Sequence, residues 1–281
     1  MARKVYNLMS VFADLHIHST YSDGKCHVDE IVSNCINSGL KYFSVTDHDT
    51  NEHIMPIQNY IKENKYSINY IPATEFTCVF KNISIHILAY CYDYDSESFK
   101  NLFKKIYTER SNSITKMCQN LNRYGCEIDA EIILKNNNSP GRPHIALELI
   151  KNGYADNLND AFNKWLIKGK PGYVNKWKPD ALKVVQMIHD AKGFAFLAHI
   201  GVYKSLKNIN DLHILKLDGF EIYHPNHGKK VTNKLIQFCQ LNNFALSGGS
   251  DFHGWYENEN PIGSYGLDEK TFEQFYNKCL N

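Results

Sequence analysis

The sequence has no long apolar run. No stretch of about 18 apolar residues, the length that indicates a membrane-spanning helix, occurs in its 281 residues, so we expect no membrane partner. The opening stretch MARKVYNLMSVFADL has two early basic residues, but Asp14 interrupts its apolar part and no small-residue cleavage pattern follows. A secretory signal is therefore not predicted, and a cytoplasmic location is expected.

An excess of charge of one sign is also missing. Lys and Arg number 31 against 30 Asp and Glu, which gives a net charge of +1 and no general attraction to polyanions. Small phosphorylated substrates or short RNA are therefore favoured over a DNA duplex. The eight cysteines form no CxxC pair, which argues for reduced thiols rather than a disulfide framework.

Short apolar or β-branched runs recur along the chain, and we interpret each as a strand. There are seven, at residues 11–18, 42–48, 68–77, 84–90, 194–200, 219–224 and 244–251. Helical patterns separate several of them, one beginning at Val28 and ending at Gly39, another beginning at Ala181 and ending at Gly193. This α/β alternation predicts a parallel sheet with covering helices, either doubly wound or closed into a barrel.

Residues 99–173 interrupt the alternation. A long helical pattern runs from Phe99 to Leu121, and shorter helices are expected near 129–136, 144–151 and 158–167. We predict that 99–173 is an inserted, small helical subdomain that binds substrate. The remaining residues, 1–98 and 174–281, would form the metal-binding α/β domain.

Side chains that can bind metals recur at the ends of the predicted strands. His16 and His18 lie two residues apart, so in a strand they project from one face about 6.6 Å apart. Further strands supply Asp47, His48, Asp49, Glu75, His86, His199, Asp251 and His253. Taken singly, a histidine in an apolar strand is more often a hydrogen-bonded core residue, and Asp23 in SDG a turn residue. Their recurrence at six of the seven strands indicates a shared metal centre.

The composition of this set indicates which metals it suits. Imidazoles and carboxylates without thiolates are typical of catalytic zinc, manganese or iron sites. We expect two or three such divalent ions, which together can activate water and clamp the oxygens of a phosphate ester.

Six motifs between residues 14 and 254 resemble, in order, those of the PHP (polymerase and histidinol phosphatase) family: DLHIHSTYSDG, VTDHDT, TEFT, IHILAY, LAHI and GSDFHG. The resemblance implies a distorted (β/α)7 barrel with a trinuclear metal site. It further implies three sets of ligands, in which Glu75 bridges the first two ions: His16, His18, Glu75 and Asp251 for the first, Glu75, His86 and His199 for the second, and Asp23, His48 and His253 for the third.

The motif GRPHIA, at 141–146 in the predicted insertion, resembles a branch of that family. This branch includes the 3',5'-nucleoside bisphosphate phosphatases and a 5'-to-3' exoribonuclease of short RNAs. The resemblance implies that Arg142 binds phosphate through its planar fork and that His144 donates a second hydrogen bond. The alternative is a surface turn before a helix, with Pro143 in the first helical turn.

The stretch EIYHPNHG, at 221–228, closes the sixth predicted strand with His224 and His227. Either could be the general acid for the leaving group, and either could contact substrate phosphate. Both could equally be solvated loop residues, and His224 is preferred because it lies at the strand end. The remaining histidines are interpreted as surface or packing residues: His27, His53, His189 and His213.

The predicted activity is metal-dependent hydrolysis of a phosphate ester. A metal-bridging hydroxide would attack phosphorus while the ions, Arg142 and His144 stabilise the developing charge. The branch resemblance implies the 3'-phosphate of 3',5'-bisphosphonucleotides such as pAp as substrate, with short RNA 5' ends as a further one. Alternatives are a cyclic ribose-phosphate phosphodiesterase, a histidinol phosphatase, and a metal-poor, non-catalytic regulatory or binding module.

Overall fold

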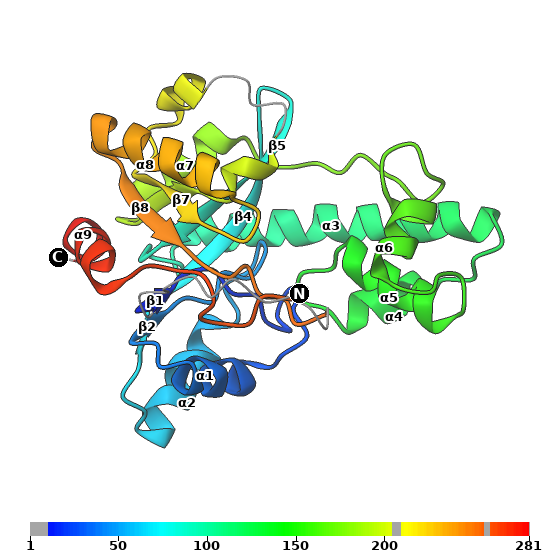
Figure 1. Cartoon of the computed structure of the whole chain (residues 1–281). Helices are drawn as coiled ribbons and strands as arrows, with labels where there is room; N and C mark the ends of the chain where they lie inside the picture. The colour runs from blue at the N-terminus through cyan, green and yellow to red at the C-terminus, as the bar shows by residue number, and fades with distance from the viewer. Residues whose placement is uncertain (1–10, 204–208, 256–258, 281) are drawn as a thin grey trace, which may run out of the picture.

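The computed structural model describes residues 11–203, 209–255 and 259–280. Strands lie at the centre of an α/β body, with helices on its outside, and a group of helices projects from one side (Figure 1). Among the described residues, no helix is both long and apolar enough to cross a bilayer. All eight cysteines are free.

The N-terminal part of the body contains a small parallel sheet. Its strands are β1 (Ala13–Asp14), β2 (Tyr42–Phe43) and β3 (Asn69–Tyr70), in the order β1-β2-β3. The connections carry α1 (Val28–Asn37) and α2 (Ile54–Asn64). Apolar side chains of both helices and of the strand segments form one buried cluster, which includes Ile31, Phe43 and Ile57. This burial explains the 3.6-residue spacing of apolar positions in the helices.

A second sheet contains five strands in the order β4-β5-β6-β7-β8. They are β4 (Ala73–Phe80), β5 (Ile83–Tyr90), β6 (Phe194–Leu197), β7 (Gly219–Tyr223) and β8 (Ala245–Gly248). The helical segments around it are α7 (Ala181–Asp190), the 3-10 helices η2 (Ile200–Val202) and η3 (Ile209–Leu215), α8 (Lys229–Asn242) and α9 (Glu269–Cys279). The apolar side chains of α7 and α8 pack against the sheet.

The expectation of an all-parallel sheet is wrong for β4 and β5, which pair in antiparallel fashion, as do β5 and β6. Only Lys81 and Asn82 separate β4 from β5, and both have positive φ, +45° and +64°. A two-residue loop of this kind forms a hairpin, since a parallel crossover needs a dozen or more residues. The predicted strand 68–77 is also divided, because Pro72 lacks the N–H needed to continue the ladder.

A closed seven-stranded barrel is not confirmed, because the strands that the structure describes form two separate sheets. Single parallel pairings join the sheets at two places: His48 pairs with Glu75, and Ile17 with Phe252. Beside the second pairing, the Leu15 N–H donates to the Gly248 carbonyl at 3.0 Å. The residues predicted as metal ligands thus lie where the two sheets meet.

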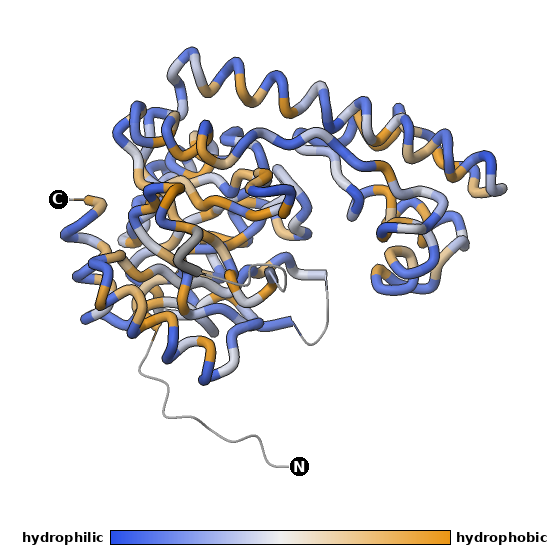
Figure 2. Tube along the Cα trace, turned by 90° about the horizontal axis from the view of Figure 1, so that it is seen from above, coloured by the Kyte–Doolittle hydropathy of each residue, from blue (hydrophilic) through white to orange (hydrophobic). Residues whose placement is uncertain are grey.

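The projecting helices are α3 (Glu97–Arg123), α4 (Ala130–Lys135), α5 (Arg142–Lys151), α6 (Leu158–Ala161) and the π-helix η1 (Phe162–Leu166). Seen from above, they extend well away from the body (Figure 2). The first part of α3 packs on the body through Phe99 and Ile106. Its second part contributes Met117 and Leu121 to a separate buried cluster shared with the other projecting helices.

Candidate metal centre

The two segments that supply His16 and Asp251, which follow β1 and β8, lie in backbone contact. The Asp251 N–H donates to the His16 carbonyl, and the His18 N–H donates to that of Phe252, both at 2.9 Å. At Gly249, an added Cβ would lie 2.4 Å from the backbone nitrogen of His16. Glycine therefore permits this close approach, which brings both imidazoles and the Asp251 carboxylate to one point.

Four side-chain atoms converge at this point: Nε2 of His16, Nε2 of His18, Oε2 of Glu75 and Oδ1 of Asp251. The two nitrogens lie 3.1 Å apart. Each lies 3.2 Å from the Glu75 oxygen, and they lie 3.3 and 3.2 Å from the Asp251 oxygen. His16, His18 and Glu75 are fully buried.

The arrangement fits a cation better than it fits hydrogen bonding. The other ring nitrogen of His16, Nδ1, lies 2.9 Å from Oε1 of Glu221, so in the neutral ring the proton belongs there and Nε2 presents a lone pair. That lone pair faces a second imidazole nitrogen and two carboxylate oxygens. Two ligands held by one zinc ion at its usual distance of about 2.0–2.2 Å lie about 3.2 Å from each other, which is the separation of these neighbouring nitrogen and oxygen atoms.

The electrostatics of the cluster also favour a cation. Burial lowers the pKa of His16, but the carboxylates of Glu221, Glu75 and Asp251 outweigh it and raise that pKa well above its usual value. Burial also lowers the pKa of His18, but the hydrogen-bonded carboxylates of Asp251 and Glu75 outweigh it and raise that pKa to about 10. The carboxylates around the two buried imidazoles therefore favour a positive charge at this place.

A second group surrounds the other oxygen of Glu75. Its Oε1 lies 2.7 Å from Nδ1 of His86 and 2.9 Å from Nε2 of His199. His48 was expected only in the third ligand set, but its Nδ1 lies 3.0 Å from Oε2 of Glu75. His48, Glu75 and His86 thus offer one group of ligand atoms, and Glu75 touches both this group and the first.

The third group forms around Asp23. Its carboxylate lies 3.9 Å from Nε2 of His48, 3.5 Å from Nε2 of His253 and 3.9 Å from Nδ1 of His18. Burial raises the pKa of Asp23, but the charges of His48 and His253 outweigh it and hold that pKa well below its usual value. With this group, all nine side chains predicted as ligands lie in one cluster.

Glu221 was missed by the sequence analysis. It is fully buried on β7, where Oε1 accepts from Nδ1 of His16 at 2.9 Å and Oε2 accepts from the His199 N–H at 2.7 Å. A carboxylate in this place fixes the tautomer and orientation of a metal-binding histidine. The signal available in the sequence was an acidic residue inside an otherwise apolar strand.

Asp47, which the sequence placed at a strand end among the metal-binding types, instead holds the turn that carries Asp23. Its carboxylate accepts from the Ser19 N–H at 2.8 Å and from the Ser22 hydroxyl at 2.5 Å. His53, interpreted as a packing or surface residue, is fully buried. Its Nδ1 lies 3.2 Å from Oδ2 of Asp47.

The structure gives His224 and His227 different surroundings. Nδ1 of His224 accepts from the Asn226 N–H at 3.1 Å, so Nε2 carries the proton and donates to Oδ2 of Asp251, also at 3.1 Å. His227 has both ring nitrogens on backbone groups, accepting from Gly201 at 2.9 Å and donating to Ile222 at 2.8 Å. His227 therefore has no nitrogen free for substrate, and neither histidine is a solvated loop residue.

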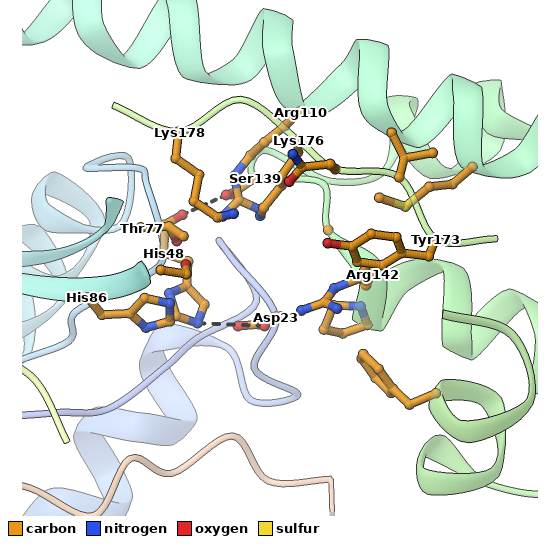
Figure 3. Close-up of a pocket in the computed structure, with 17 residues that line it drawn as sticks. Asp23, His48, Thr77, His86, Arg110, Ser139, Arg142, Tyr173, Lys176 and Lys178 are labelled. Atoms are coloured by element: carbon orange, nitrogen blue, oxygen red, sulfur yellow. Dashed lines mark hydrogen bonds and ion pairs between the residues drawn. The ribbon is translucent and has the colours of Figure 1, made fainter. Parts of the chain in front are cut away.

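A pocket of about 310 Å³ opens beside the cluster, between the body and the projecting helices (Figure 3). Asp23, His48 and His86 line it from the body. Arg142, the first residue of α5, lines the opposite wall, and its guanidinium lies over the Phe162 ring, 5.6 Å from its centroid. Burial lowers the pKa of Arg142, but a guanidinium stays charged at neutral pH.

His144 is not one of the described residues that line this pocket. Its Nδ1 accepts from the Gly141 N–H at 3.0 Å, in a capping box that begins α5. The hydrogen bond from His144 to phosphate stays a prediction, in which Nε2 would be the donor because Nδ1 is already an acceptor. His144 fixes the start of α5, where Arg142 stands.

Sequence comparison identifies known proteins that this chain resembles. The family described as PHP domain matches residues 14–240. The chain is 29% identical over 253 residues to the 5'-3' exoribonuclease Rnm of Escherichia coli, covering 87% of this chain and 86% of the relative. It is 25% identical over 258 residues to a 3',5'-nucleoside bisphosphate phosphatase of Chromobacterium violaceum, covering 89% and 90%.

Two further comparisons extend this result. The chain is 22% identical over 261 residues to a phosphoribosyl 1,2-cyclic phosphate 1,2-diphosphodiesterase of Eggerthella lenta, covering 89% of this chain and 97% of the relative. The fold is similar to that of a proposed metal-dependent phosphoesterase from Bifidobacterium adolescentis, with a TM-score of 0.85, 23% identity and 96% of each chain covered.

Proposed function

The chain belongs to the PHP domain family, and from that premise we propose that it is a metal-dependent phosphoesterase. The observation that carries the proposal is the cluster of nine buried or partly buried imidazole and carboxylate side chains beside a pocket. Relatives named as phosphatase, exoribonuclease and cyclic phosphodiesterase all hydrolyse phosphate esters. A complete set of ligand types favours catalysis over a metal-poor binding module.

The nine side chains would hold two or three divalent ions of manganese, zinc or iron. His16, His18, Glu75 and Asp251 would hold the first, and Glu75 would bridge to the second with His86 and His199. Asp23, His48 and His253 would hold the third, since a neutral imidazole has one lone pair and ligates one ion. When bound, such ions activate water for attack on phosphorus and neutralise charge on the phosphoryl oxygens.

The surrounding residues position the ligands and the substrate. Glu221 directs the His16 lone pair toward the cluster, and His224 holds Asp251 through the hydrogen bond described above. We therefore assign His224 a positioning role instead of general-acid catalysis. Arg142 lies in the pocket with its planar donors available to a phosphoryl group, and His144 keeps α5 in the place that this requires.

We propose the 3'-phosphate of 3',5'-bisphosphonucleotides such as pAp as the substrate, with 5' ends of short RNA as a second one. The pocket volume lies at the lower end of the range for small-molecule sites. Phe162 and Tyr173 offer aromatic surface to a nucleotide, and segment 99–173 would be the substrate-binding subdomain. The free cysteines suit a reducing compartment such as the cytoplasm.

The substrate proposal is tested by measuring phosphate release by the metal-loaded protein from four compounds. These are pAp, a short 5'-phosphorylated RNA, a ribose cyclic phosphate and histidinol phosphate. We expect the highest kcat/KM with pAp. Release only from histidinol phosphate or only from the cyclic phosphate would contradict the substrate, and release from none of the four would contradict the activity.

Replacing Glu221 with glutamine is expected to weaken metal binding about 10- to 100-fold, because the amide no longer fixes the proton on Nδ1 of His16. Titration of the metal-free protein with Zn²⁺ measures this without reference to activity. Glu269→Gln, at an exposed position in the first turn of α9, serves as the control. An unchanged affinity in the Glu221 variant would show that the carboxylate has no positioning role.

A further inference from the structure

The segment that returns from the projecting helices to the body, residues 174–179, brings two lysines into the pocket. Lys176 and Lys178 both line it. Trp177, between them, is exposed, and Nζ of Lys105 lies over its ring, 4.5 Å from the centroid. Alternation of this kind is expected of an extended chain. The end of the segment is fixed to β4, because the Val79 N–H donates to the Pro179 carbonyl at 2.9 Å.

These lysines differ from Arg110 in lying within ion-pair distance of no described carboxylate, and Asp49 acts on both of them only from farther away. Arg110 also lines the pocket, but Asp49 forms a buried ion pair with it. In the described part of the chain, no carboxylate forms an ion pair with Lys176 or Lys178. Burial and the nearby charge of Arg110 lower the pKa of Lys176 to about 7, and burial also lowers that of Lys178.

An incompletely solvated ammonium without a partner is costly, and a bound anion would remove that cost. The reacting phosphate must lie at the metal ligands that line the pocket, Asp23, His48 and His86. Figure 3 shows Lys176 beside Arg110, across the opening from Asp23 and His86. The pocket therefore presents cationic groups to a ligand at a place other than the metal cluster.

We propose that Lys176 and Lys178 form a second anion subsite, which binds the phosphate that is not cleaved. The inference rests on the proposed function and narrows it, since it requires substrates that carry a phosphate monoester in addition to the reacting one. In a 3',5'-bisphosphonucleotide this would be the 5'-phosphate. The aromatic wall of Phe162 and Tyr173 would then contact the nucleoside.

The test compares kcat/KM of the metal-loaded protein for adenosine 3',5'-bisphosphate and adenosine 3'-phosphate, with and without the substitution Lys176→Met. Loss of one charge-assisted contact is expected to lower kcat/KM for the bisphosphate about 10- to 100-fold. The loss should be at least tenfold smaller for the 3'-phosphate. Lys178→Met is the second variant, and Lys170→Met, exposed and outside the pocket lining, is the control.

A binding measurement separates failure of this subsite from failure of the proposed function. Adenosine 5'-phosphate, which carries only the second phosphate, should bind the wild-type protein at least tenfold more tightly than either lysine variant, as measured by calorimetry. If no substrate is hydrolysed, the proposed activity fails while this comparison still decides the subsite. Equal losses for both substrates, or unchanged affinity for adenosine 5'-phosphate in both variants, would overturn the inference.

Discussion

Glu75→Gln is expected to lower kcat/KM for phosphate ester hydrolysis by at least about 10³-fold and to empty most of the metal centre. Both oxygens of Glu75 are in use: Oε2 faces His16, His18 and His48, and Oε1 faces His86 and His199. An amide keeps one of these oxygens and replaces the other with an NH₂ group, which cannot bind a metal. It also removes the charge shared by two of the proposed sites.

Metal content by elemental analysis and steady-state kinetics measure the effect on the same preparation. Circular dichroism establishes that the variant is folded. Glu273→Gln, at an exposed position of α9, is expected to retain metal and activity. A folded Glu75 variant with wild-type metal content and turnover would show that this carboxylate does not join the proposed sites.

Arg110→Met is expected to lower the free energy of unfolding by about 3–5 kcal/mol, because it leaves the Asp49 carboxylate buried without its partner. Burial raises the pKa of Asp49, but the charges of Arg110 and Lys176 outweigh this and keep it below its usual value. Asp49 also accepts from the Thr77 N–H at 2.7 Å, and Arg110 donates to the Pro140 carbonyl at 3.0 Å. The pair thus connects α3 to two loops beside the metal ligands.

Chemical denaturation measures this loss. Arg123→Met removes the same side chain from an exposed position of the same helix and is expected to change stability by no more than about 0.5 kcal/mol. Activity of the Arg110 variant should also fall, since the pocket wall that it forms would shift. A stability change as small as that of the control would show that Asp49 is accommodated without its partner.

The sequence together with the family resemblance predicted the nine side chains that meet in the cluster, but not Glu221. Ligand types recurring from strand to strand were expected to converge, and they do, but the argument from C-terminal strand ends applies only to parallel strands and not to the antiparallel pair that carries Glu75 and His86. The family resemblance is confirmed by the match over residues 14–240. Which atoms of His48 face which carboxylate depends on side-chain rotamers, and this is why its contact with Glu75 was not anticipated.

Features set by contacts between distant segments were not predictable in the same way. Whether a barrel closes depends on pairings such as that of Ile17 with Phe252, which leave no periodic pattern in the sequence. The short loop at Lys81 and Asn82 was visible and should have indicated a hairpin. The direction that Lys176 and Lys178 face follows from how the insertion packs on the body, because alternation alone does not say which side is inside.

The most direct test of the metal centre is anomalous diffraction at the manganese, iron and zinc edges, from crystals of protein purified without chelators. The account predicts anomalous peaks between His16 and Glu75 and between Glu75 and His86, in protein that hydrolyses phosphate esters. Crystals of equally active protein without an anomalous peak among these side chains would contradict it.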